Sequence, residues 1–370
     1  MDDTPELLPY IRPTLRNMGR WNPTRLLPGE RNGNVHRMDL NECPLPPSPK
    51  VIEAIRDHAH MVNRYADGGC PDLTEKISAA TGVPVDLICW GTGSAELLAN
   101  IVRLAIAPGD GVVAPTPVWR RFHGVFSSLE ADVAHVDIRD DGSVDPDGMI
   151  AACNGKTKIM VCVTPNNPSG AMLSEAEVRK VAEETPDDVL LYLDEAYYEF
   201  ARFAGGPDGL AILQEHRKGP WIVTRTFSKA YAMAGLRMGY AMASNVSIIN
   251  ALRSLTGTFN VSAMSEAAAL AAWEDQDHAL RIQEITATER RRIVDGLGEM
   301  GIEALPSVTN FVSAPLDRPA GPVIQAMKER NIRIAGWAEE GYGHMIRVSI
   351  GLPEDTDAFL AALREILDDG

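Results

Sequence analysis

The 370-residue sequence has few cysteines and no long apolar run. Its apolar stretches, such as Ala267–Trp273, are far too short to cross a bilayer, and its N-terminus lacks the basic and apolar regions of a signal peptide. The five cysteines are odd in number and show no CxxC spacing, which excludes a disulfide framework and a zinc site and favours a reducing compartment. We therefore expect a cytoplasmic protein without a metal.

Positive charge is also scarce. The chain has 35 basic and 51 acidic side chains, a formal net charge of −16. A field of that sign repels phosphate backbones and anionic lipids, so we expect neither nucleic acid nor a membrane as a partner. Only eight of the basic residues are lysines, so each lysine is worth locating. With 45% apolar residues, the chain can bury a sizeable core.

The pattern along the chain predicts an α/β fold. Short β-branched runs alternate with helical patterns, which is typical of a large, doubly wound, mostly parallel sheet with helices on both faces. After about residue 265 the sequence pattern changes to long helices with two further strands, which predicts a smaller α+β C-terminal domain. We assign residues 1–40 to an N-terminal arm, 41–265 to the large domain and 266–370 to the small domain. The strands that we expect are Leu87–Trp90, Gly111–Ala114, Lys158–Val163, Val189–Leu193, Trp221–Thr226, Gly239–Met242, Asn310–Ser313 and Met345–Ile350.

Three polar residues follow successive strands of the predicted large sheet. These are Asn167, Asp194 and Lys229, and their separations of 27 and 35 residues each leave room for one helical crossover. Ligands of open parallel sheets bind outside the carboxyl ends of the strands. We therefore expect an amide, a carboxylate and a lysine to converge on one crevice.

A phosphate site is predicted beside them. The turn Gly91–Ser94 stands between a strand and a helix, where free backbone N–H groups suit an anion, and Arg237 adds a fixed cation. A lysine for a Schiff base, a carboxylate facing a ring nitrogen and a phosphate cradle together satisfy pyridoxal 5′-phosphate (PLP). Taken singly, each residue has an ordinary structural explanation; taken together and in order, they favour the cofactor.

Three motifs carry a family resemblance. The stretch from Val163 to Gly170 resembles the NPNNPTG signature of class I/II aminotransferases of PLP fold type I. Asp194–Tyr197 is similar to the family's DEAY motif, and Arg225–Tyr240 resembles its lysine segment. The similarity runs over most of the chain and is greatest to the histidinol-phosphate aminotransferases. It implies a homodimeric aminotransferase with ping-pong chemistry.

The resemblance implies roles for individual residues. Lys229 would bind the cofactor aldehyde and later move a proton, Asp194 would pair with the ring nitrogen, and Asn167 and Tyr197 would hydrogen-bond the ring's 3-oxygen. Trp119 would stack on the ring. The phosphate site would comprise Gly93, Ser94, Ala95, Thr226, Ser228, Arg237 and, from the partner subunit, Tyr65. The substrate would contact Arg347, which would hold its α-carboxylate, together with Asn41 and Tyr10.

One departure bears on the substrate. Histidinol-phosphate enzymes tend to end the strand near residue 335 with an arginine that meets the substrate phosphate, whereas this chain has Ala335 followed by Gly336 and Trp337. Alternatives therefore stay open: an aminotransferase of a specialised pathway or of aromatic amino acids, and a PLP decarboxylase resembling threonine-phosphate decarboxylase. A non-catalytic ligand-binding relative is disfavoured because every cofactor position is filled. A dinucleotide enzyme is disfavoured because no GxGxxG turn follows the first strand.

Overall fold

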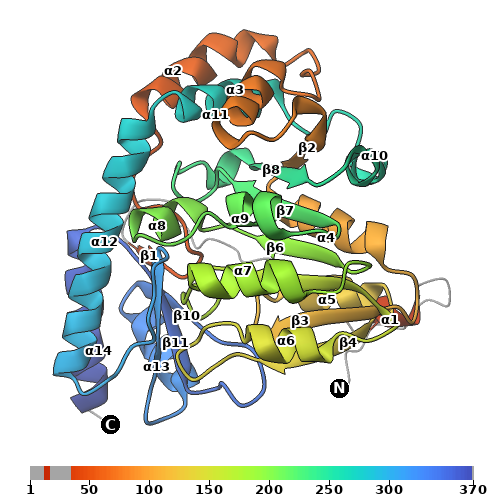
Figure 1. Ribbon diagram of the computed structural model, residues 1–370. Helices are drawn as coiled ribbons and strands as arrows, with labels where there is room; N and C mark the ends of the chain where they lie inside the picture. Colours follow the sequence, from red (N-terminus) through yellow and green to blue (C-terminus); the bar gives the residue numbers. More distant parts are fainter. Residues whose placement is uncertain (1–11, 17–34, 369–370) are drawn as a thin grey trace.

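The computed structural model describes residues 12–16 and 35–368. They form two sheets with helices packed around them (Figure 1). No helix of the described residues is long and apolar enough to cross a membrane, and within the same residues no group of three or more His, Cys, Asp or Glu side chains could hold a metal ion.

The larger sheet has seven strands in the order β2-β8-β7-β6-β5-β3-β4. Strand β8 runs antiparallel to both of its neighbours, and the other pairs are parallel. This is the mostly parallel, doubly wound sheet that the sequence predicts. Its strands are β2 (Ile88–Thr92), β3 (Gly111–Thr116), β4 (Asp132–Asp137), β5 (Thr157–Val163), β6 (Leu190–Asp194), β7 (Trp221–Thr226) and β8 (Met238–Ala243).

Helices cover both faces of this sheet because successive strand residues point to opposite sides. In β3, Val112 and Ala114 pack into one apolar cluster, whereas Val113 packs into the other. The first face carries α4 (Ser94–Ala105), α5 (Arg121–Ser128) and α10 (Val246–Leu255). The second face carries α2 (Pro49–His58), α3 (Pro71–Thr81), α6 (Pro146–Ala152), α7 (Glu175–Glu184), α9 (Gly209–His216) and α11 (Ala263–Trp273).

The smaller sheet has four strands in the order β1-β10-β11-β9. It packs on α12, α13 and α14 through a third apolar cluster that includes Leu297, Met327 and Phe359. Helix α12 runs along one side of the molecule from the α2–α3–α11 group to α14 and so joins the two parts (Figure 1). The elements are β1 (His36–Met38), β9 (Phe311–Pro315), β10 (Ile332–Gly336), β11 (Met345–Ser349), α12 (Gln276–Glu299), α13 (Ala320–Glu329) and α14 (Pro353–Asp368).

Three strands of the described residues are absent from the eight expected from the sequence pattern. One of them, β10, is the strand that the family resemblance places near residue 335. Strand β4 lies at the edge of the large sheet and alternates between exposed and half-buried residues, so its sequence contains no apolar run. Strand β1 lies inside the segment predicted as an arm and pairs in parallel with β10, so residues 36–38 belong to the smaller sheet. The division of the chain at residues 40 and 265 stays a prediction. The remaining short elements are α1 (Pro13–Arg16), α8 (Tyr198–Phe203), η2 (Ala59–Met61), η3 (Val85–Leu87) and η4 (Ala234–Leu236).

Candidate active site

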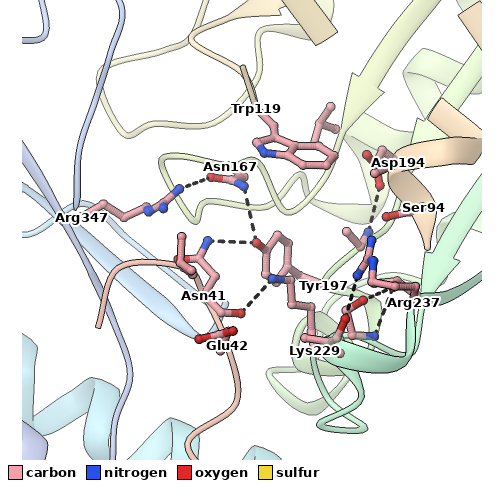
Figure 2. A pocket seen from close by; sticks show the side chains of 18 residues that line it. Asn41, Glu42, Ser94, Trp119, Asn167, Asp194, Tyr197, Lys229, Arg237 and Arg347 are labelled. Atoms are coloured by element: carbon pink, nitrogen blue, oxygen red, sulfur yellow. Dashed lines mark hydrogen bonds between the residues drawn. The ribbon is translucent and has the colours of Figure 1, made fainter. Parts of the chain in front are cut away.

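A cavity of about 420 Å³ lies at the carboxyl ends of β5, β6 and β7, where the sequence predicts the crevice (Figure 2). Most of the predicted site residues line it, although they come from segments as far apart as β11 and the loop after β1. The lining residues that the sequence predicts are Asn41, Ser94, Ala95, Trp119, Asn167, Asp194, Tyr197, Thr226, Ser228, Lys229, Arg237 and Arg347.

Lys229 lies in the loop after β7 and, among the described residues, is the only lysine that lines the cavity. Its Nζ donates a hydrogen bond to the backbone oxygen of Asn41 over 2.8 Å. Burial, reinforced by the positive charges of Arg347 and Arg237, lowers the pKa of Lys229 to about 8. The neutral fraction of this amine near pH 7 is therefore far larger than that of an ordinary lysine, and the neutral state is the one in which an amine is a nucleophile.

Asp194 is the last residue of β6, and its side chain is buried at the cavity wall. Burial raises the pKa of its carboxyl group to about 7. Two groups orient it: Oδ1 accepts from the Ala196 amide over 3.1 Å and from Thr224 Oγ1 over 3.3 Å. A buried carboxylate held in this way strongly favours a positively charged partner in the cavity.

A chain of polar contacts joins Lys229's end of the cavity to Arg347 (Figure 2). The Tyr197 hydroxyl accepts from Asn41 Nδ2 over 3.0 Å and from Asn167 Nδ2 over 3.5 Å. Asn167 Oδ1 in turn accepts from Arg347 Nη1 over 2.9 Å. Burial raises the pKa of Tyr197 to about 12, so its hydroxyl keeps a proton that it can donate to a ligand.

The predicted phosphate cradle lies at the opposite end of the cavity from Arg347 (Figure 2). Helix α4 begins at Ser94 after Gly93, whose φ of +73° places it in the left-handed region. A Cβ at Gly93 would lie 2.4 Å from Arg237 Nη2, so the guanidinium packs directly on this backbone. Thr226 Oγ1 donates to Ser228 Oγ over 2.9 Å beside them. Hydroxyls, a guanidinium and a helix N-terminus form an anion site.

Two predicted residues do not line the cavity, and a third is outside the part of the chain that the structure describes. Gly93 shapes the cradle without lining the cavity. Tyr65 is 80% exposed, does not line this cavity, and stacks on Phe259 with 4.4 Å between ring centroids. Tyr10 lies outside the described residues.

Several functional positions were not assigned from the sequence. Glu42 lines the cavity, and its negative charge acts to raise the pKa of Lys229; its place directly after Asn41 was the available signal. Behind the cavity, the buried Arg225 Nε donates to Glu195 Oε2 over 2.8 Å and so ties β7 to the residue after Asp194. The Arg225–Glu195 ion pair depends on the alignment of β6 with β7, which the sequence motifs do not reveal.

The cavity fits PLP on three structural grounds. The Asp194 carboxylate lacks a cationic partner among the described side chains that contact it, and a protonated ring nitrogen would supply one. The backbone at Gly93 leaves no room for a Cβ beside Arg237, as an anion cradle requires. The Nε of Arg347 is buried without a hydrogen-bond acceptor, as suits a group awaiting a carboxylate.

Comparison with known proteins defines the class of enzyme. The family model "Aminotransferase class I and II" matches residues 34–363. The chain belongs to this family and is a PLP-dependent aminotransferase of fold type I. The resemblance, fold class, enzyme class and cofactor predicted from the sequence are thereby confirmed.

The individual relatives include histidinol-phosphate aminotransferases and an aromatic amino acid aminotransferase. Histidinol-phosphate aminotransferase 1 of Mesorhizobium japonicum is 33% identical over 90% of this chain and 90% of that protein. An aromatic amino acid aminotransferase of Rhodococcus opacus is 35% identical over 91% of this chain and 92% of that protein. The crystal structure of histidinol-phosphate aminotransferase from Sinorhizobium meliloti in complex with pyridoxal-5′-phosphate superposes with a TM-score of 0.86 at 29% identity, covering 98% of this chain and 99% of that one. These relatives favour transamination over decarboxylation.

Proposed function

We propose that this aminotransferase moves an amino group from a donor amine or amino acid to a 2-oxo acid in two half-reactions at the single cavity described above. The observation that carries the proposal is the pairing of a lysine whose pKa is lowered to about 8 with a buried carboxylate across one cavity. Bound PLP supplies an electron-accepting ring and stores the amino group between the two half-reactions. Donor and acceptor use the same cavity in turn, which gives ping-pong kinetics.

The residues of the chain divide the work. Neutral Lys229 Nζ would bond to the cofactor and later carry a proton to or from the donor's reacting carbon. Asp194 would keep a ring nitrogen beside it protonated, and the Tyr197 and Asn167 side chains would hydrogen-bond the ring's 3-oxygen. Trp119 would stack on the ring. At the phosphate end, Ser94, Ala95, Thr226, Ser228 and Arg237 would hold the anion.

At the other end of the cavity we assign the substrate carboxylate to Arg347. Its guanidinium presents several N–H donors in one plane, which matches a carboxylate in a bidentate pair. Two of its donors are already engaged, by Asn167 Oδ1 at 2.9 Å and by the Asp39 backbone oxygen at 2.8 Å, so the group is held in place before substrate arrives. Asn41 and Tyr10 complete the predicted substrate site.

We also propose that the enzyme is a homodimer in which the partner subunit's Tyr65 reaches the phosphate. In this chain Tyr65 and Phe259 form an exposed aromatic stack, and Val62, three residues before Tyr65, is 71% exposed. Exposed apolar side chains grouped in this way are typical of protein interfaces. All five cysteines are free, which supports a cytoplasmic location.

The experiment is the absorption spectrum of the protein with PLP, before and after adding histidinol phosphate, L-glutamate and aromatic amino acids in turn. Two of these kinds of donor, histidinol phosphate and aromatic amino acids, are suggested by the relatives' names. Conversion of the lysine-bound cofactor band to the pyridoxamine form by any of these donors supports transamination. Release of carbon dioxide without transfer of the amino group contradicts it.

A further inference from the structure

A second cavity adjoins the cofactor cavity at the substrate end. Its volume is about 210 Å³, and it shares Trp119, Asn167 and Arg347 with the larger cavity. The loop after β10 closes its far side with Trp337 and Glu339. When Arg347 binds the carboxylate of a substrate, the side chain of that substrate can extend into this second cavity.

The strand register places no charge directly opposite Arg347. Ala335 of β10 lies directly opposite Arg347 of β11 in the antiparallel pair, so both side chains emerge on the same face of the smaller sheet. A methyl group at residue 335 provides neither a hydrogen bond nor a positive charge there. The next residue, Gly336, lines the second cavity and adds none.

The negative charge in the second cavity comes from Glu339. Its side chain is half-buried, and Oε2 accepts a hydrogen bond from the Ala338 amide over 3.1 Å. The other carboxylate oxygen makes no hydrogen bond to any described residue. The negative charge of Glu339 also affects neighbouring elements, because it acts to raise the pKa of both Arg347 and His123.

Positive charges near this carboxylate are engaged or solvated. Arg347 is assigned to the substrate carboxylate. Arg120 also lines the cavity but is exposed, and water screens an exposed guanidinium. Arg37 lies 3.1 Å from Glu42 and is paired with it. Of the described charged residues that line the second cavity, the half-buried one left for a ligand is therefore Glu339.

The walls of the cavity suit the same kind of ligand. Trp119 lines both cavities, and Trp337 is buried, with Nε1 donating to Ser313 Oγ over 3.1 Å. Indole faces attract cations, and a nearby carboxylate adds to that attraction. A phosphate placed here would instead meet the Glu339 carboxylate, with the exposed and solvated Arg120 to offset it.

We infer, on the basis of the proposed function, that the second cavity binds the distal part of the amino donor and that Glu339 selects donors carrying a cationic nitrogen there over donors carrying an anionic group. Glu339 is thus a specificity-determining residue. Arg347 binds the carboxylate end, the tryptophans flank the methylene chain, and Glu339 receives the distal cation.

The test uses three amino acids that share three side-chain methylenes and differ only in the terminal group: L-ornithine (cationic), L-norleucine (neutral) and L-2-aminoadipate (anionic). Each is titrated into the holoenzyme while the cofactor absorption is followed, which gives an apparent affinity and a half-reaction rate. We expect L-ornithine to bind most tightly and L-2-aminoadipate least, with about tenfold or more between the two extremes.

Two variants isolate the charge. Glu339→Gln keeps an oxygen for the Ala338 amide and removes only the charge, and it should weaken L-ornithine about tenfold while leaving L-norleucine within about twofold. Glu340→Gln is the matched control, because Glu340 is exposed on the same loop and does not line the cavity. It should change neither.

The outcomes separate this inference from the proposed function. A holoenzyme that reacts best with L-2-aminoadipate, shows the same order in Glu339→Gln, or reacts with neither L-ornithine nor L-norleucine overturns the inference. The proposed function stands in these cases if another donor converts the cofactor. A protein in which PLP never forms its lysine-bound absorption band overturns the proposed function itself.

Discussion

Replacing Asp194 by asparagine should have opposite effects on catalysis and on the stability of the cofactor-free protein. The pKa of Asp194 is raised from 3.8 to about 7, and at about 1.4 kcal/mol per pKa unit this shift corresponds to roughly 4 kcal/mol. That is the free energy by which the pocket without a cationic partner disfavours the ionised carboxylate. A cation beside the carboxylate recovers a similar amount.

For catalysis under the proposed function, Asp194→Asn removes the charge that would keep the ring nitrogen protonated. Because the asparagine oxygen can still accept from Ala196 and Thr224, the geometry should be preserved. Loss of roughly 4 kcal/mol of stabilisation predicts a fall in kcat on the order of 10³-fold. Single-turnover kinetics with a fixed donor measure the chemical step directly.

For stability, the sign follows from a folded-state pKa that lies above the unfolded one. The protonated Asp194 carboxyl group is tolerated below about pH 4, and the apoprotein loses stability as the pH rises from there through about 7. Asparagine does not ionise, so the Asp194→Asn apoprotein should unfold at a higher temperature than wild type at pH 8, and the difference should vanish near pH 4. Asp188→Asn, at an exposed carboxylate before the same strand, is the control and should show neither effect.

Two results would refute this reasoning. A kcat within tenfold of wild type would mean that the carboxylate does not support the ring. An Asp194→Asn apoprotein less stable than wild type at pH 8 would mean that another group already offsets the negative charge of Asp194 in the cofactor-free protein.

Three further predictions concern the cofactor site. Because the pKa of Lys229 is lowered to about 8, the rate at which PLP bonds to the apoprotein should rise with pH up to about 8 and then level off; a rate still rising tenfold per unit at pH 9.5 would indicate an ordinary lysine. Gly93→Ala would place a Cβ 2.4 Å from Arg237 Nη2 and should weaken PLP binding at least tenfold in a fluorescence titration, whereas Gly82→Ala, with a similar φ of +71° and open space around it, should not. Tyr65→Phe should weaken PLP binding while leaving the dimer intact by light scattering; a monomeric wild-type protein with full activity would contradict a role for Tyr65 across an interface.

The strands and most residues that line the cavity were predictable because their signals are local. Apolar runs mark the buried strands, and Asn167, Asp194 and Lys229 each follow one of them, so their convergence requires only parallel strand order. The edge strand β4 escaped prediction because exposed polar residues interrupt its apolar pattern.

Contacts that depend on tertiary register were not predictable. Lys229 meets the backbone of Asn41, 188 positions away, and Arg347 meets Asn167, 180 positions away. The position of Ala335 opposite Arg347 was likewise set by the pairing of β10 with β11. The sequence indicated that a positive charge was missing at residue 335. It did not indicate that the loop after β10 brings the Glu339 carboxylate to the second cavity.

The most direct test of the central claim is to locate the covalent bond between PLP and the protein. The holoenzyme is reduced with borohydride, digested and examined by mass spectrometry, with Lys229→Ala and Lys218→Ala compared alongside. We predict that the cofactor is attached to Lys229, that Lys218→Ala retains it, and that Lys229→Ala folds but neither binds PLP covalently nor turns over. Attachment at another lysine, or full turnover by Lys229→Ala, would contradict the account.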